Sequence, residues 1–130
     1  MPGPFTSLLF DMDNTLFDLV LAKTRACGEV TRRIGIGTTG DLFSYFLRKQ
    51  GGFEDPGNIR DFMIDHSCYD QELYMECVSV YCEEKLRYIA PYPGVEDTLV
   101  LLKESGFRMG IVTDAHLPDT SLRLGRTRLA

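Results

Sequence analysis

The sequence has few of the residues from which zinc-binding proteins build their metal sites. It contains two histidines, His66 and His116, and four cysteines, none of them spaced as CxxC. Because zinc sites draw on clustered cysteines and histidines, this scarcity argues against a zinc protein. The cysteines are therefore expected to act as small core side chains in a reducing compartment, which favours a cytoplasmic location. They are Cys27, Cys68, Cys77 and Cys82.

Long hydrophobic runs and an excess of positive charge are also missing. No stretch reaches membrane-spanning length, and Met1–Pro4 has no basic residue with which a signal peptide would begin. A net charge of −5 does not suggest a nucleic-acid partner. From Glu54 to Glu84 Arg60 is the only base among nine acids, which indicates a solvated helical face or a surface that discourages polyanions. We predict no membrane and no nucleic-acid partner, and the sequence predicts no oligomeric state.

What is present is typical of a globular protein with a real core, at 130 residues and 44% hydrophobic content. The most informative stretch is Phe5–Phe17, an apolar run that ends at Asp11 and Asp13. The run predicts a buried strand. Since an unpaired buried charge is costly, the carboxylates are expected at the strand's carboxyl end, where open α/β sheets bind ligands. Alternation then directs both to the same side, where they could share a cation such as Mg²⁺.

Helical periodicity predicts four helices between residues 18 and 90. The first ends at Ile34, the second runs from Asp41 to Gln50, the third opens at Asp55, and Asp70 caps the fourth. Met63, Met75 and the tyrosines either join a helix-on-helix core or line a ligand pocket, and we expect the core. The other inward positions are predicted to be Leu19, Ala22, Ala26, Val30, Leu42, Phe43, Phe46, Leu47, Ile59, Phe62, Leu73, Cys77 and Val80.

After residue 90 the pattern predicts a hinge, a helix and a second strand. Pro91–Gly94 is a rigid hinge, and Gly106 suits the position that follows a helix C-terminus. Phe107–Val112 is a second apolar run, which ends at Thr113 and Asp114. A strand, a helix and a strand form the repeating unit of a parallel sheet, so the two strand ends should be neighbours. The helix between them is expected to turn Val95, Leu99 and Leu102 to one face.

These elements predict an α/β protein with a partial Rossmann-like parallel-sheet core and an inserted α-helical cap domain. Residues 1–17 and 91–130 would form the core, and residues 18–90 the cap. A weak last helix is predicted after Asp119, with Leu122 and Leu129 on one face.

Isolated histidines and basic residues are given structural roles. His66 and His116 are expected in loops or caps, although His116 could touch a substrate. The basic residues either meet an anionic substrate or form a solvated face, and we expect the solvated face. They are Arg25, Arg32, Arg33, Arg48 and Lys49 in the cap, and Arg123, Arg126 and Arg128 in the tail.

Two carboxylates and a hydroxyl at neighbouring strand ends suit phosphoryl transfer. With a cation neutralising the phosphoryl group, one carboxylate can attack phosphorus and form an aspartyl-phosphate. The other can protonate the leaving oxygen and later activate water. A hydroxyl and backbone N–H groups can hold the remaining phosphate oxygens. Asp11, Asp13 and Thr113 provide those parts.

The segment Asp11-Met12-Asp13-Asn14-Thr15-Leu16 after an apolar strand, with Ile111-Val112-Thr113-Asp114 later, resembles the haloacid dehalogenase superfamily of hydrolases. The similarity includes Tyr92–Val95 and covers residues 5–17 and 91–115. The resemblance implies Asp11 as nucleophile and Asp13 as general acid and base. It also implies Mg²⁺ on the Asp11 carboxylate and the Asp13 backbone carbonyl. Thr113, with Asp114 beside it, would bind the phosphate.

Two departures from the family pattern affect these expectations. Asn14 stands where many members have glycine, but asparagine tolerates the left-handed backbone that glycine would supply. The family also needs a downstream lysine and a further acidic motif, whereas the last lysine here is Lys103 and the chain stops soon after Thr113. We therefore expect a fragment of a longer hydrolase that is inactive alone and leaves a sheet edge open.

Asp13 distinguishes some of the possible functions. A carbon–halogen hydrolase of the same superfamily does not need a leaving-group acid at this position, so Mg²⁺-dependent hydrolysis of a small phosphorylated metabolite is favoured. A phosphomutase uses the same groups and is poorly separated from a phosphatase. From a different class comes a non-catalytic fold remnant or interaction module, which the missing lysine and acidic motif favour.

Overall fold

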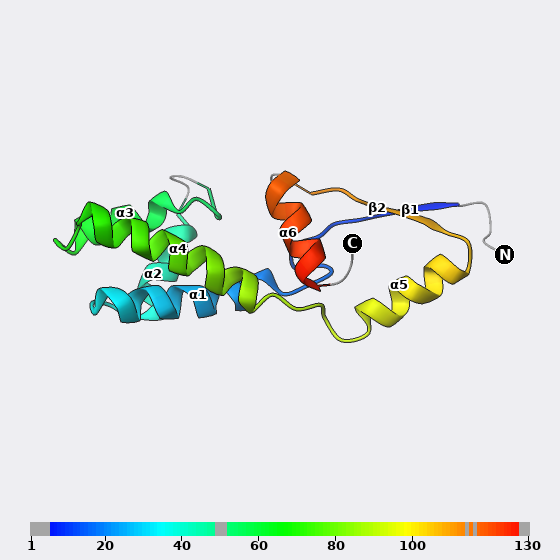
Figure 1. The fold of residues 1–130 in the computed structure, drawn as a ribbon, viewed down its shortest axis with the longest axis horizontal. Coiled ribbons are helices and arrows are strands. Elements are labelled where there is room, and N and C mark those ends of the chain that lie inside the picture. Colours follow the sequence, from blue (N-terminus) through cyan, green and yellow to red (C-terminus); the bar gives the residue numbers. More distant parts are fainter. Residues whose placement is uncertain (1–5, 49–51, 114, 116, 128–130) are drawn as a thin grey trace. The chain divides into compact units, whose positions relative to one another are not determined.

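The computed structural model describes residues 6–48, 52–113, 115 and 117–127. Two compact units divide the chain: a sheet unit of Met1–Leu19 with Ile89–Ala130, and a helical unit of Val20–Tyr88. In chain order the elements are β1 (Ser7–Phe10), α1 (Leu19–Ile34), α2 (Thr39–Phe46), α3 (Gly57–Asp65), α4 (Gln71–Arg87), α5 (Val95–Glu104), β2 (Arg108–Ile111) and α6 (Leu117–Thr127) (Figure 1). In the described part of the chain, no helix is long and apolar enough to cross a membrane.

The sheet unit contains a parallel strand pair, as predicted. β1 and β2 pair in register from Ser7 opposite Arg108 to Phe10 opposite Ile111. The expectation of a buried first strand was wrong, because Leu9 is 73% exposed. The described residues of the sheet unit supply two strands and the helices α5 and α6, whereas a parallel sheet usually has more strands and helices on both faces.

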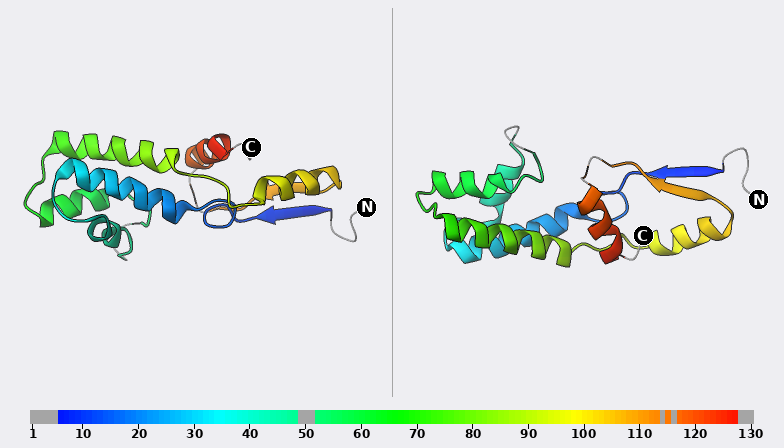
Figure 2. Two further views of the ribbon diagram at one scale, coloured as in Figure 1. Left: turned by 90° about the horizontal axis from the view of Figure 1, so that it is seen from below. Right: turned by 45° about the horizontal axis from the view of Figure 1, so that its top comes forward.

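α5 lies alongside the strand pair but buries none of its residues (Figures 1 and 2). Its predicted inner positions Val95, Leu99 and Leu102 are only half-buried, and a hollow of about 790 Å³ lies between the helix and the strands. Gly106 follows the helix with a φ of +91° and donates its N–H to the Lys103 carbonyl, as its predicted position requires.

The helical unit has a continuous apolar core to which all four of its helices contribute, and α1 and α4 lie side by side (Figure 2). The rings of Phe46 and Tyr81 stack inside it with centroids 5.1 Å apart. This confirms helix-on-helix packing for most of the predicted inward positions. The fully buried members of the core are Ala26, Cys27, Val30, Leu42, Phe46, Ile59, Phe62, Met63, Cys77 and Tyr81.

Polar side chains set the starts of two of these helices. Thr38 and Asp41 form a reciprocal capping box, so α2 begins two residues earlier than predicted. The predicted inward position of Leu47 was wrong, because α2 ends at Phe46 and leaves Leu47 exposed. Asp70 accepts a hydrogen bond from the Leu73 N–H at 2.9 Å, which confirms it as the cap of α4.

Lys23, which the periodicity did not identify, is fully buried in the helical unit. Its ammonium donates to the Phe53 carbonyl and lies 3.6 Å from the centre of the Phe53 ring. The Phe46 ring is 4.6 Å away, and the Tyr81 ring 5.9 Å. Aromatic faces therefore surround the buried cation and stabilise it through their negative quadrupoles.

Candidate active site at the strand ends

The segment that follows β1 turns sharply and is held by its apolar residues. Met12, Leu16 and Phe17 are buried, and the Leu16 N–H bonds back to the Met12 carbonyl at 2.9 Å. Asn14 has a φ of +60°, which confirms the left-handed backbone expected there. Its side-chain oxygen also accepts a hydrogen bond from the Leu19 N–H at 3.0 Å, at the start of α1. The turn therefore fixes the backbone of the polar residues 13–15, which lie between the buried Met12 and Leu16.

Asp11 follows the last residue of β1 and is exposed. Its Oδ2 accepts a hydrogen bond from the Thr15 hydroxyl at 2.9 Å. Among the described residues, this hydroxyl is the partner that the structure records for the Asp11 carboxylate. An exposed carboxylate oriented by one hydroxyl is accessible to a ligand in solution.

Thr113 lies at the same edge of the strand pair as Asp11. The register that joins Phe10 to Ile111 continues in the Val112 N–H, which donates to the Phe10 carbonyl at 2.8 Å. The half-buried Thr113 accepts a hydrogen bond from the Ala115 N–H at 3.2 Å, which turns the chain after β2. The predicted neighbours Asp11 and Thr113 thus follow adjacent strand ends. Asp114 and His116 lie outside the described residues.

Asp13 contacts a residue that the sequence did not connect with it. Its Oδ2 lies 2.7 Å from Nη1 of Arg123, and the exposed fractions of the two side chains are 18% and 3%. The expectation that Arg123 is a solvated helix residue was therefore wrong. The contact spans 110 positions, which no local pattern detects. The spacing of Thr120, Arg123 and Thr127 does mark one helix face, and all three are buried.

The described basic residues of the helical unit named in the sequence analysis each contact an acidic or aromatic side chain of that unit. Arg32 lies 3.0 Å from Glu29, Arg48 lies 2.8 Å from Asp61, and Arg33 pairs with Glu76. The Arg25 guanidinium lies over the ring of Tyr88. Lys49 lies outside the described residues.

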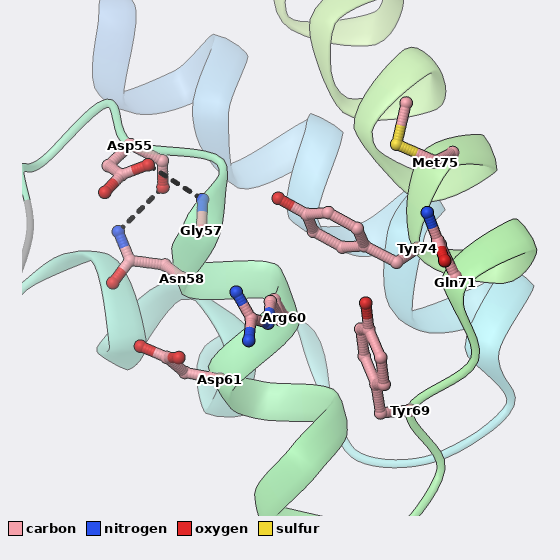
Figure 3. Close-up of a pocket in the computed structure, with 9 residues that line it drawn as sticks. All are labelled: Asp55, Gly57, Asn58, Arg60, Asp61, Tyr69, Gln71, Tyr74 and Met75. Carbon is pink, nitrogen blue, oxygen red and sulfur yellow. Dashed lines mark hydrogen bonds between the residues drawn. The ribbon is translucent and has the colours of Figure 1, made fainter.

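The helical unit also has a hollow of about 350 Å³ between the beginnings of α3 and α4 (Figure 3). Met75 and Tyr74 line it, whereas Met63 belongs to the core, so the expected core position is confirmed for Met63 and was wrong for Met75, which is exposed. Burial, followed by the nearby Asp55 charge, raises the pKa of Tyr74. The lining carboxylates are engaged, Asp55 with the Gly57 N–H and Asp61 with Arg48.

The oxygen atoms at the strand ends fit a hard divalent cation as a partial ligand set. The Asp11 carboxylate is exposed, and Mg²⁺ is commonly held by one or two carboxylates with several waters retained. Within the described ranges, no group of three or more His, Cys, Asp or Glu side chains is arranged to hold a metal ion. The described donors are therefore compatible with part of the ligand set of such a cation.

Known proteins similar in sequence to this chain indicate its family. A family model described as haloacid dehalogenase-like hydrolase matches residues 8–129. A glyceraldehyde 3-phosphate phosphatase from Methanopyrus kandleri is 32% identical over an alignment of 117 residues, and the match covers 82% of this chain and 50% of that protein. One from Pyrococcus abyssi is 27% identical over 84% of this chain and 49% of its own length. The chain thus spans about half the length of these curated relatives.

Solved structures share the fold at lower sequence identity. A Thermotoga maritima protein assigned as a beta-phosphoglucomutase has a TM-score of 0.77 and 19% identity, over 96% of this chain and 57% of that one. CbbY from Rhodobacter sphaeroides, solved in complex with phosphate, has a TM-score of 0.56 and 18% identity, over 97% and 58%. The similarity confirms a partial Rossmann-like α/β fold. Since the family model covers nearly the whole sequence, this chain belongs to the haloacid dehalogenase-like hydrolases.

Proposed function

We propose that the protein containing this chain is a Mg²⁺-dependent phosphatase that hydrolyses a small phosphate monoester. The observation that carries the proposal is the exposed Asp11 carboxylate at the end of β1, in line with the strand end that bears Thr113. The phosphatase names of the two curated relatives support the reaction class. Because the chain spans about half their length, the proposal concerns the whole protein.

In the proposed first step, an Asp11 carboxylate oxygen attacks phosphorus. A bond forms between Asp11 and phosphorus, the bond from phosphorus to the leaving oxygen breaks, and Asp13 donates a proton to that oxygen. The Thr15 hydroxyl orients Asp11 for this attack through its 2.9 Å hydrogen bond. Thr113 and the neighbouring Asp114 segment would bind the phosphate oxygens that do not react.

In the second step, water replaces Asp11 on phosphorus. Asp13 takes a proton from the water, the new oxygen–phosphorus bond forms, and the Asp11–phosphorus bond breaks to release inorganic phosphate. The Asp11 carboxylate and the Asp13 backbone carbonyl would hold Mg²⁺, which when bound neutralises charge on the phosphoryl group. We also propose that residues 18–90 act as a cap that selects the substrate, in a cytoplasmic protein.

The test is Mg²⁺-dependent phosphate release from an aryl phosphate by the polypeptide that the complete reading frame encodes. We expect Asp11→Asn to lower turnover by a factor of about a thousand or more. Asp97→Asn, which changes an exposed carboxylate on α5, is the matched control and should keep wild-type turnover. Undiminished turnover in Asp11→Asn would contradict the nucleophile assignment.

The same assay separates the alternatives. Conversion of a sugar phosphate into its isomer, without release of inorganic phosphate, would identify a phosphomutase. No Mg²⁺-dependent turnover of any phosphate ester, with the protein folded, would favour a non-catalytic interaction module.

A further inference from the structure

Arg123 and Asp13 form a shielded ion pair at the candidate site. The Arg123 side chain is 3% exposed, and its Nη1 lies 2.7 Å from the Asp13 Oδ2. At that separation the contact is a charge-assisted hydrogen bond of normal length. A guanidinium so little exposed gains less from water than a surface arginine, so its energy depends on the groups around it.

The helix that carries Arg123, α6, has an unusual buried face. Among its described side chains, the buried ones are the polar Thr120, Arg123 and Thr127, whereas Leu117 and Leu122 are 77% and 56% exposed. The predicted inner position of Leu122 was therefore wrong, and Asp119 lies in the first turn of α6 rather than before it. An amphipathic helix normally buries its apolar side. In α6 the buried face is polar instead, and it includes the contact of Arg123 with Asp13.

We propose that Arg123 is a positioning residue of the candidate active site. Its guanidinium fixes the Asp13 carboxylate and, as a positive charge already present, opposes the binding of a divalent cation at Asp11 and Asp13. The fixing of Asp13 rests on the geometry alone, whereas the effect on a cation rests on the proposed function.

Elementary electrostatics gives the size of the effect. A unit charge about 6 Å from a divalent cation, at the dielectric constant of water, weakens cation binding about tenfold. The coupling is reciprocal, so a cation bound at Asp11 and Asp13 must weaken the hold of Asp13 on α6 by the same factor. Amide hydrogen exchange in α6 should then become faster when Mg²⁺ is added.

The first test is a double-mutant cycle on the unfolding of the 130-residue chain without metal, using Asp13→Asn, Arg123→Met and the pair together. Asp13→Asn should raise the unfolding equilibrium constant about a hundredfold, because Arg123 stays buried without that carboxylate. Arg123→Met should raise the unfolding equilibrium constant by a smaller factor, since the Asp13 side chain is more exposed to water than that of Arg123. The double variant should be at least tenfold more stable than additivity predicts. Additive effects would overturn the assignment.

The second test measures cation binding, with Mn²⁺ followed by electron paramagnetic resonance and Mg²⁺ added as competitor. Arg123→Met should bind the cation about tenfold more tightly than the wild-type chain, and Arg123→Lys should bind it like the wild type. Arg108→Met, which removes an exposed arginine of the same unit, is the control and should change nothing. Equal affinities, or no binding by any variant, would contradict the cation effect.

The two tests also separate this inference from the proposed function. A strong Asp13–Arg123 coupling in a protein without phosphatase activity would leave the positioning role intact and remove the proposed function. Mg²⁺-dependent phosphatase activity without that coupling would do the reverse.

Discussion

The helical unit and the sheet unit bury their side chains to very different extents. In the helical unit, ten fully or nearly fully buried side chains form one connected core, and Phe46 and Tyr81 stack within it. In the sheet unit, α5 buries no residue, and Leu9 on β1 is largely exposed. The candidate site residues Asp11, Asp13 and Thr113 all belong to this less buried unit.

The two units should therefore contribute differently to the stability of the chain, and the unit with less apolar burial contains the candidate site. Apolar burial is the main favourable term in folding, so the helical unit should contribute most of the stability of the described chain. The sheet unit has fewer buried apolar side chains, among them Met12, Leu16 and Phe17, and also has the backbone register of two strands and polar contacts such as the Asp13–Arg123 pair. Substitutions in the two units should therefore have very different effects on unfolding.

The largest expected effect comes from truncating the core of the helical unit. Phe62→Ala should lower the free energy of unfolding by about 3–5 kcal/mol, because Phe62 is fully buried. Leu101→Ala, at a position that is 63% exposed on α5, should change it by less than about 0.5 kcal/mol. Urea unfolding followed by circular dichroism measures both. Losses of equal size would remove the contrast between the units.

Lys23 tests whether the helical core is held by packing alone. Lys23→Ala should lower the free energy of unfolding by about 3 kcal/mol, because it leaves a cavity and removes the cation from the rings of Phe46 and Phe53. Lys23→Met keeps the packing volume and should cost only about 1 kcal/mol. The same urea experiment compares them. If the two variants lose equal stability, the charge rather than the stem of Lys23 holds this part of the core.

Burial of two cysteines predicts a loss of stability in alkali. Burial raises the pKa of the Cys27 thiol to about 12 and that of Cys77 to about 11, from an ordinary value of 9.0. The unfolded chain therefore releases these protons first, and stability falls as pH rises above about 9. The slope should approach about 1.4 kcal/mol per pH unit for each thiol.

Unfolding measured between pH 8 and 10.5 checks this slope. Cys27→Ala and Cys77→Ala should each remove one thiol's share of the slope, because both cysteines are buried. A slope unaffected by the Cys27 substitution would show that other groups cause the alkaline loss.

The smallest effect expected is at a helix start in the helical unit. Asp70→Ala should cost about 1 kcal/mol, because it removes the carboxylate that accepts the Leu73 N–H. Glu72→Ala, in the same first turn, should cost only about 0.3 kcal/mol through the helix dipole. Thermal unfolding should rank the two in this order, and the reverse order would contradict the capping role.

The elements that local rules describe were predictable from the sequence. Helical spacing gave the end of α1 at Ile34, and the chemistry of asparagine gave the left-handed turn at Asn14. The order of strands and helices also predicted that the strand ends at Asp11 and Thr113 would be neighbours, and the pairing of Phe10 with Ile111 just before them agrees with this. These features depend on residues close in sequence or on strong topological rules.

The features that were missed depend on distant contacts or on what surrounds an element. The apolar run around Leu9 predicts a strand, but its burial depends on layers that the described residues do not supply. Lys23 is buried because aromatic rings from other segments meet around it. Arg123 reaches Asp13 from 110 positions away, on a helix whose leucines suggested the opposite orientation.

The proposed function requires that Asp11 accept the phosphoryl group. The most direct measurement is rapid acid quenching of the complete protein during turnover of a phosphate monoester, followed by peptide mass spectrometry. We expect the mass of one phosphoryl group on the peptide that contains Asp11, and none on that peptide in Asp11→Asn. A phosphoryl group on another residue, or turnover that continues in Asp11→Asn with no labelled peptide, would contradict the account.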